Sequence, residues 1–443
     1  MNLVYGIKDR PRFGQVVLFA LQQLLAIMAA TIAVPAVVNS VTGSDMTASA
    51  ARFGAGVGSI VYLLFTRSKS PVFLGSSFAF LGPMFTAFGG AASMAVGYAG
   101  LIIGAAIAGL VYVIIALVVR FCGVRWIDKL MPPVIIGPTV AIIGLSLAGN
   151  AIGDLMTSSV EGGSVYVCLI CGLVTLAVTV LVSTYSKKML KLIPFIIGIL
   201  AGYLCASIFA LIGSATGNSA LTVINYSALQ NMGSFIALPQ FSFLKADWGG
   251  VNGAYLLTLF VAYAPVAFVV FAEHLADHKN LSSIVGQNLL EDPGLDKTLL
   301  GDGIGSMVGA FFGGCPNTTY GESIATVAIT RNASTVSIWG AAFACIIFSM
   351  ITPLVCFLET IPNCVMGGVC VALYGFIAAS GLKMLQPVDL NKNRNLFVAS
   401  IIFIVGVGGM TVSFGAVEIR TVACALILGI LTNVMLSKEK DED

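Results

Sequence analysis

The sequence predicts an all-α polytopic membrane protein, and its composition is the first reason. Of the 443 residues, 58% are hydrophobic and 9% are charged, and the mean hydropathy is +0.99. A soluble protein carries roughly 25% charged residues and roughly 45–50% apolar ones. This excludes a secreted disulfide scaffold, a disordered regulator and a conventional cytosolic enzyme. The net charge of +2 is too small for a nucleic-acid-binding surface.

The second reason is that apolar runs recur along the whole chain at nearly the length of a spanning helix, about 20 residues. They begin around Val16, Ala51, Ala95, Val134, Val165, Leu192, Ala254, Ala333, Cys364, Leu396 and Val417. Three further segments, residues 71–90, 298–314 and 315–331, are apolar but short or interrupted by Gly, Pro, Ser and Thr. Together these runs predict about fourteen transmembrane segments.

The basic residues indicate an orientation. If the N-terminus, with Lys8 and Arg10, lies in the cytoplasm, most of the 22 Lys and Arg fall in loops on that side, and only Lys245 falls in a loop on the opposite side. Short cytoplasmic loops carry such an excess. Residues 1–12 lack an apolar signal sequence, so we expect a multi-pass protein of the inner (plasma) membrane with both termini cytoplasmic.

The two halves of the chain echo each other. Pro132 and Gly137 recur as Pro362 and Gly367, about half the chain later, and each half has a broken segment in third place. Seven segments per half is an odd number, so the repeats must be inverted in the membrane. We predict a first repeat at residues 1–215, a linker or extracellular loop at 216–250, a second repeat at 251–437 and a cytoplasmic tail at 438–443. Interrupted segments at matching places are typical of a transporter binding site.

Glu322 is the first candidate binding residue. It follows residues 317–321 (NTTYG), where we expect an extended chain and then a helix start with free backbone N–H groups. A carboxylate beside such donors matches the N–H and C=O edge of a planar heterocyclic amide. Phe78, Phe80 and Tyr320 offer rings that could stack on the heterocycle. The alternative is that Glu322 is a first-turn acid that only favours the helix dipole.

Glu273 and Asp277 are the second candidates, because charged groups at membrane depth are costly and mark functional sites. They are four residues apart and share a helix face. No basic residue lies at comparable depth nearby in the sequence, and two neighbouring carboxylates in a low-dielectric setting favour protonation of at least one, which suits proton coupling. The alternative is a pair held by a basic partner for folding. His274 should face away from the partner of Glu273, in a packing or supporting role, and His278 is expected at the water interface.

Other polar groups are interpreted more simply. Asp302 lies between glycines in residues 301–305 (GDGIG), and Glu418 and Arg420, near the start of the last predicted span, are interpreted as an interfacial contact. Most of the ten cysteines lie in apolar runs without further ligands nearby, so we expect packing residues. We therefore expect no cofactor and no metal site.

Four strings carry a resemblance to a known family: residues 76–80 (SSFAF), 272–274 (AEH), 291–295 (EDPGL) and 317–322 (NTTYGE). With them the chain resembles the bacterial uracil permeases, part of the nucleobase–ascorbate (nucleobase:cation symporter-2) transporter family. The resemblance implies fourteen segments in two inverted repeats, with a short strand in segments 3 and 10. It also implies a core domain (segments 1–4 and 8–11), a gate domain (5–7 and 12–14), a homodimer and proton-coupled uptake.

The resemblance also implies roles for individual residues. By motif, Glu273 and Glu322 would hold the edge of a pyrimidine, and backbone groups of Phe78 and Gly321 would add hydrogen bonds. Some uracil permeases carry a histidine where this chain has Asp277. We therefore expect Asp277 to relay the proton in place of that histidine. The rings that would line the site or the gate interface are Tyr320 and Tyr374.

These observations predict a secondary active transporter, and not an enzyme, that imports a nucleobase, with uracil as the first candidate, by proton symport with elevator-like movement of core against gate. An acceptor-only carboxylate at Glu322 matches the two N–H groups of uracil, although xanthine also offers N–H donors. The alternatives are a purine (xanthine or urate) symporter and, more remotely, an anion transporter of the same fold. The acidic side chain of Glu322 argues against an anion transporter. The expected partners are a nucleobase, protons, lipid and a second copy, with no nucleic acid.

Overall fold

Long apolar helices make up most of the chain in the computed structural model, which describes residues 3–123, 132–187, 190, 193–230, 232–414, 417–419 and 421–438. Among these residues, eight helical stretches are long and apolar enough to cross a membrane. They are α1 (Phe13–Thr42), α2 (Ala48–Phe65), α4 (Met94–Cys122), α6 with α7 (Pro133–Ser146 and Ala148–Leu155), α8 (Val165–Tyr185), α9 (Pro194–Thr216), α12 (Gly253–Val285) and α17 (Asn363–Met384).

Further helices, most of them shorter, fill the remaining predicted segments. They are α3 (Leu81–Gly89), α13 (Leu295–Gly313), α14 (Gly321–Thr330), α15 (Thr335–Met350), α16 (Thr352–Glu359), α18 (Asn393–Val407) and α19 (Thr421–Met435). A mostly helical polytopic membrane protein is therefore confirmed, while the count of fourteen segments stays a prediction. One of the three segments expected to be short or interrupted, residues 298–314, is not interrupted, because α13 runs through it to Gly313.

The ends of the helices follow local signals in the sequence. The side chains of Ser93 and Asn252 cap α4 and α12 by accepting hydrogen bonds from the backbone N–H groups of Val96 and Tyr255. Helix α12 ends at Gly286, whose φ of +70° is the left-handed conformation that favours glycine at this position. Because α12 continues to Val285, it carries Glu273, Asp277 and the residues after them on one uninterrupted helix.

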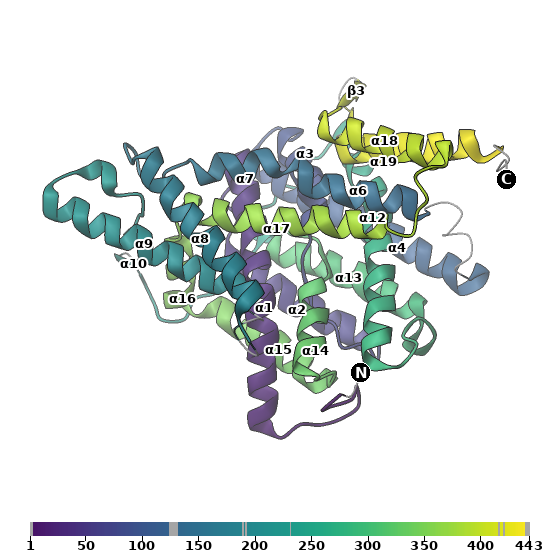
Figure 1. Ribbon diagram of the computed structural model, residues 1–443, viewed down its shortest axis with the longest axis horizontal. Helices are drawn as coiled ribbons and strands as arrows, with labels where there is room; N and C mark the ends of the chain where they lie inside the picture. Colours follow the sequence, from purple (N-terminus) through teal and green to yellow (C-terminus); the bar gives the residue numbers. More distant parts are fainter. Residues whose placement is uncertain are drawn as a thin grey trace.

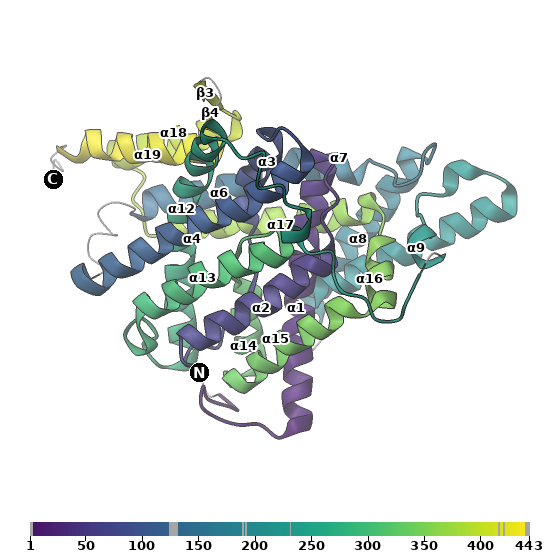
Figure 2. The same cartoon turned by 180° about the vertical axis from the view of Figure 1, so that it is seen from behind.

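Two groups of helices can be distinguished by their packing. In one, α2 packs against α13 and α15, and α4 packs against α12 and α13; Figure 2 shows α2, α13 and α15 side by side. In the other, α17 packs against α6 and α8, α8 against α9, and α18 against α19. Figure 1 shows α8 and α9 at the end of the molecule farthest from the C-terminus. Helix α1 contacts both groups.

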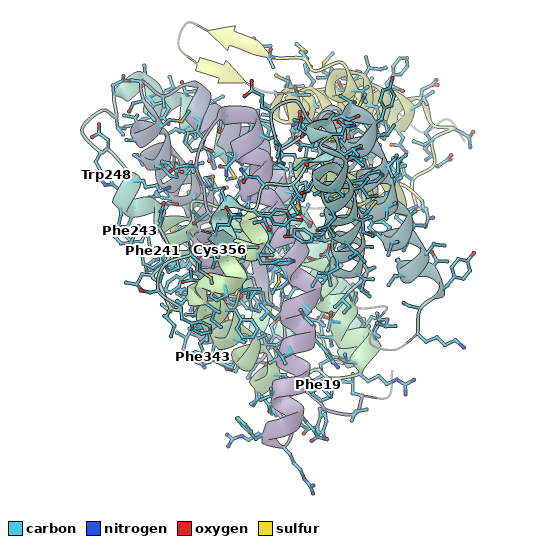
Figure 3. All side chains as sticks on the ribbon, turned by 90° about the vertical axis from the view of Figure 1, so that its left-hand side faces the viewer. Phe19, Phe241, Phe243, Trp248, Phe343 and Cys356 are labelled. Carbon is cyan, nitrogen blue, oxygen red and sulfur yellow. The ribbon has the colours of Figure 1, made fainter. Side chains whose placement is uncertain are left out.

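The polar connection between the halves is held against the first helix group. Its short helix α11 (Ser242–Lys245) packs on α4 and α13. Phe241 and Phe243, which lie beside each other in Figure 3, stack at 5.7 Å between ring centroids. Phe243 also stacks on Phe311 of α13 at 4.6 Å. These aromatic contacts hold the connection against α13.

The last predicted span begins later than expected. It was expected around Val417, but strands β3 (Val412–Phe414) and β4 (Val417–Ile419) pair antiparallel, and α19 starts at Thr421. The reason is that β-branched and aromatic residues alternate with other residues here, which favours strands. The contact expected between Glu418 and Arg420 involves side chains outside the described part of the chain.

Candidate functional site

Two short strands meet at the centre of the fold. Strand β1 (Leu74–Ser76) lies in the first broken segment and β2 (Asn317–Thr319) in the second, and they pair antiparallel with Gly75 opposite Thr318. A short strand is therefore present in each of these two interrupted segments, as predicted. A Cβ on Gly75 would lie 2.4 Å from the ring of Tyr320, and the Tyr320 hydroxyl donates to the carbonyl of Ser76. Glycine at position 75 makes this close approach possible.

A helix begins directly after each strand. The turn η1 (Phe78–Phe80) and α3 follow β1, and α14 follows β2 with Gly321 as its first residue. The first N–H groups of a helix have no acceptor within it, so both segments offer backbone donors here. The start of α14 is held by Ser323, whose carbonyl accepts from Gln23 at 3.2 Å and whose hydroxyl accepts from the N–H of Phe73 at 3.0 Å.

These two helix starts border a cavity of about 330 Å³. Its polar wall comes from η1, α12, β2 and α14, and its largely apolar wall from α6 and α17. The lining residues are Ala30, Ser77, Phe78, Ala79, Val140, Ile143, Glu273, Asp277, Thr318, Tyr320, Gly321, Glu322, Ala325, Leu373, Phe376, Ile377, Ser380 and Met384. Ligand pockets are about 300–1,000 Å³, so the cavity suits a small ligand.

Three carboxylates face this cavity. Glu273 and Asp277 lie one turn apart on α12, as expected from their spacing, and Glu322 lies in the first turn of α14; all three are half-buried. Asp277 accepts a 2.8 Å hydrogen bond from the hydroxyl of Thr319. No Lys or Arg is found among the described residues that line the cavity. The site can therefore accept N–H donors and protons, and its own carboxylates repel anions.

The two histidines of α12 lie outside the cavity, in a buried network. Nδ1 of His274 lies 2.7 Å from Oδ2 of Asp302, and its Nε2 lies 3.0 Å from the hydroxyl of Thr298. His274 therefore faces away from the cavity, as expected. The expectation for His278 was wrong: it is fully buried, with Nε2 2.7 Å from the hydroxyl of Tyr62. The reason is that α12 extends beyond Lys279 and packs His278 against α2.

Phe78 and Tyr374 differ in their relation to the cavity. Phe78 lines it, whereas Tyr374 is buried in α17 behind that wall and is not among the lining residues. Their rings meet edge to face at 5.9 Å between centroids. On the far side of Phe78, Ala79 and Ile143 lies another cavity of about 280 Å³, which these three residues also line. They form a thin wall between the two spaces.

Sequence reasoning missed most of the wall opposite the carboxylates. This wall includes Phe376, Ile377 and Ser380 of α17 and Val140 and Ile143 of α6. In the sequence these residues look like any others in an apolar span. The one available signal was the repeat of Pro132 and Gly137 at Pro362 and Gly367, since it marks the starts of the two helices that form the wall.

Carboxylates inside a helical membrane fold, beside two interrupted segments, define a membrane transporter. The pattern of the Permease family matches residues 14–414 of the chain. The uracil permease of Bacillus caldolyticus is 37% identical over 98% of this chain and 94% of its own length, and that of Escherichia coli (strain K12) is 36% identical over 96% and 92%. The chain therefore belongs to the Permease family, whose members are transporters and not enzymes.

Solved structures show the same fold at low sequence identity. The transmembrane domain of the cyanobacterial bicarbonate transporter BicA superposes with a TM-score of 0.65 at 15% identity, covering 96% of this chain and 99% of that domain. The murine Slc26a9 anion transporter in its inward-facing state gives a TM-score of 0.65 at 13% identity, over 97% of this chain and 69% of that one.

Proposed function

We propose that this protein imports uracil, or a close pyrimidine, together with protons across the bacterial plasma membrane. The observation that carries the proposal is the convergence of Glu273 and Glu322 with two helix starts on one small cavity. The names of the similar permeases support the choice of uracil.

The hydrogen-bond acceptors and donors of the cavity match the donors and acceptors of a pyrimidine. Ionised carboxylates only accept hydrogen bonds, and uracil presents two N–H donors; Glu322 and Glu273 supply these acceptors. The backbone N–H groups of Phe78 and Gly321 donate to the carbonyl oxygens of the base. The side chain of Phe78 packs on its ring, and Tyr320 closes the wall beside the strands.

Proton coupling follows from the charge of the site. Three carboxylates close together in a low-dielectric cavity favour protonation of at least one. Asp277 differs from Glu273 and Glu322 because it holds a hydrogen bond from Thr319. Glu273 and Asp277, one turn apart on α12, share the proton, and Glu322 acts chiefly on the base. A protonated Glu273 keeps a carbonyl oxygen that still accepts an N–H of the base.

The two alternatives meet different objections. An anion transporter shares the fold, but Glu273, Asp277 and Glu322 would repel its substrate. A purine such as xanthine or urate shares the N–H donors but carries a second ring, which must fit against Phe376 and Ile377. The competition experiment below separates uracil from xanthine directly.

The proposal includes the architecture that the family resemblance implies. It comprises fourteen segments in two inverted repeats (residues 1–215 and 251–437), joined by an extracellular connection at 216–250, with a cytoplasmic tail at 438–443 and both termini cytoplasmic. The helix group with α2, α4, α12 and α13 is the core, and the group with α6, α8, α9, α17, α18 and α19 is the gate. Elevator-like movement of the core against the gate, in a homodimer, carries the base across. The two strands at matching places support this arrangement.

Uptake of radiolabelled uracil into proteoliposomes with an inward proton gradient tests the proposal. Unlabelled xanthine is the competitor, and Glu322→Gln is the site variant. The matched control is Glu161→Gln, an exposed acid that does not line the cavity. We expect uptake that depends on the gradient, resists xanthine, is lost in Glu322→Gln and is kept in Glu161→Gln. Strong competition by xanthine, or full activity of Glu322→Gln, would show that the pyrimidine assignment is wrong.

A further inference from the structure

A separate and much smaller cavity lies on the other side of the strands, between α4, α13 and β2. Its volume is about 10 Å³, and a space of about 10–15 Å³ holds one particle of the size of water. The lining residues are Phe80, Ala108, Gly109, Tyr112, Asp302, Gly303, Ser306 and Asn317. Four of them are polar and all four are at most 5% exposed.

Each of the four polar residues has an oxygen without a hydrogen-bond partner in the described part of the chain. These atoms are the Tyr112 hydroxyl, Oδ1 of Asp302, the Ser306 hydroxyl and Oδ1 of Asn317. The other oxygen of Asp302 contacts Nδ1 of His274 at 2.7 Å, and the amide nitrogen of Asn317 donates to the carbonyl of Gly54 at 3.1 Å. Both residues are thus fixed at one end and have one oxygen left for the cavity.

The position of Asn317 is set by two glycines. A Cβ on Gly58 would lie 2.4 Å from the amide nitrogen of Asn317, and a Cβ on Gly309 would lie 2.1 Å from it. The absence of side chains at both places is what admits the amide group between α2 and α13. The two glycines thus leave room for a polar side chain at membrane depth. A polar atom without a partner is costly at that depth.

We infer that this cavity binds a monovalent cation of the size of Na⁺, with Oδ1 of Asp302 as its anionic ligand and the oxygens of Asn317, Ser306 and Tyr112 as its neutral ligands. The ligand set consists of oxygen atoms, which suit hard cations and not zinc or copper. It contains one carboxylate, which balances one positive charge. With Nδ1 of His274 protonated and donating to Oδ2, Asp302 remains an anion and the imidazole remains neutral.

This site extends the function of the protein beyond the transport cavity. Its ligands come from α4, α13 and β2, so the ion ties together three elements far apart in the chain. Asn317 precedes Thr318, which lines the transport cavity, and Thr319, which binds Asp277. The ion therefore stabilises the strand from which the transport site is built, and its effect is measurable without any transport.

Thermal unfolding of the purified full-length protein tests the inference. The midpoint is measured in choline chloride and in NaCl, KCl and LiCl at the same ionic strength, without nucleobase. Binding to the folded state alone raises stability with ligand concentration, so we expect a saturable rise of the midpoint by several degrees in Na⁺ over choline. Equal midpoints in all four salts would overturn the inference, and would mean that the cavity holds water beside a protonated Asp302.

Variants place the effect at this cavity. Ser306→Ala removes an unpartnered hydroxyl and should fold normally, while the Na⁺ concentration for half of the shift rises roughly 10-fold or more. Asp302→Asn should abolish the shift. The matched control is Thr139→Val, whose buried hydroxyl bonds to the carbonyl of Ile135 in its own helix, and which should keep the parental response. A parental Na⁺ response in Ser306→Ala or Asp302→Asn would refute the site, and so would a lost response in Thr139→Val.

Discussion

The hydroxyl of Thr319 donates a 2.8 Å hydrogen bond to Asp277. This contact joins β2, the strand that leads into Glu322, to α12, the helix that carries Glu273 and Asp277. The group proposed to bind the base and the group proposed to carry the proton are therefore held on one structural unit. A movement of β2 on binding the base would change the hydrogen bonding of Asp277 directly, which gives a physical route for coupling.

Asp277→Asn should separate binding from coupling. The amide keeps the shape of the side chain and can still bond to Thr319, but it cannot take up a proton. We expect equilibrium binding of uracil within about threefold of the parent, which is less than 1 kcal/mol, while accumulation driven by a proton gradient is lost. Binding is measured on purified protein, and exchange of labelled for unlabelled uracil should continue.

Thr319→Val is the companion variant for the same contact. It removes the hydroxyl donor but leaves the carboxylate, so gradient-driven uptake should persist with an altered dependence on pH. If Asp277→Asn accumulates uracil as the parent does, Asp277 is not the coupling residue and Glu273 becomes the remaining candidate on α12.

The sequence predicted the polar half of the site better than the apolar half. Glu273 and Asp277 could be placed on one face by helical spacing. Residues 317–322 (NTTYGE) predicted an extended chain followed by a helix start, and the family resemblance implied that the extended chain is a strand. That residues 74–76 pair with residues 317–319 could not be worked out from spacing, because register over such a distance depends on the whole fold. His278 was misplaced because its burial depends on Tyr62 of α2, a residue distant in the chain, and local composition does not reveal that contact.

Asp302 shows the same limit. Its position between glycines was visible, but its partner His274 lies on another helix, and the hydroxyls of Tyr112 and Ser306 look like ordinary span residues. The paired strands at 412–414 and 417–419 were missed because this short alternating stretch was interpreted as part of the apolar run that follows. In each case the missing information was which distant element supplies the partner.

Phe78→Ala should both weaken binding and open the wall between the two larger cavities. The ring is one of three side chains that line both spaces, and an aromatic pair contributes about 0.5–1.5 kcal/mol beyond its buried area. We expect uracil affinity to fall by roughly 10-fold, about 1.4 kcal/mol, and preloaded proteoliposomes to leak uracil without a gradient.

Tyr374→Phe is the control for Phe78→Ala. Its hydroxyl is buried without a hydrogen-bond partner in the described structure, and the edge-to-face contact of its ring with Phe78 survives the change. Affinity and leak should therefore match the parent. A tight, non-leaking Phe78→Ala protein would show that Ala79 and Ile143 suffice as the wall.

Asp45→Asn should reduce stability in a way that depends on pH. Hydrogen bonds from Lys245 and then Tyr98, each 2.7 Å long, lower the pKa of Asp45 in the loop between α1 and α2. A folded pKa below the unfolded value of about 3.9 stabilises the fold above that pH, and this stabilisation is lost as the pH falls through the folded pKa. The side chain of Asp45 is largely exposed, so the effect is at most about 1 kcal/mol.

The measurement compares the thermal midpoints of the parent and Asp45→Asn proteins at about pH 7 and about pH 3. The parent should be more stable than the variant at the higher pH, and this difference should be smaller at the lower pH, where the Asp45 carboxylate takes up protons. It should also shrink at about 1 M salt, where the screening length is about 3 Å. A difference that is unchanged at low pH would mean that the Asp45 charge does not contribute.

Gly309→Ala should destabilise the centre of the fold. A Cβ at this place would lie 2.1 Å from the amide of Asn317, so either the amide leaves its bond to Gly54 or α13 moves away from β2. Overpacking of this kind costs about 1–3 kcal/mol, and we expect both a lower thermal midpoint and reduced uracil uptake. Gly149→Ala is the matched control, because a Cβ there meets no atom within 4 Å and lies in helix α7. It should be neutral or stabilising by up to about 1 kcal/mol, since alanine favours the helix. If Gly309→Ala unfolds at the same temperature as Gly149→Ala, the cavity beside Asn317 is wider than its neighbours indicate, and the glycine is not required for close packing there.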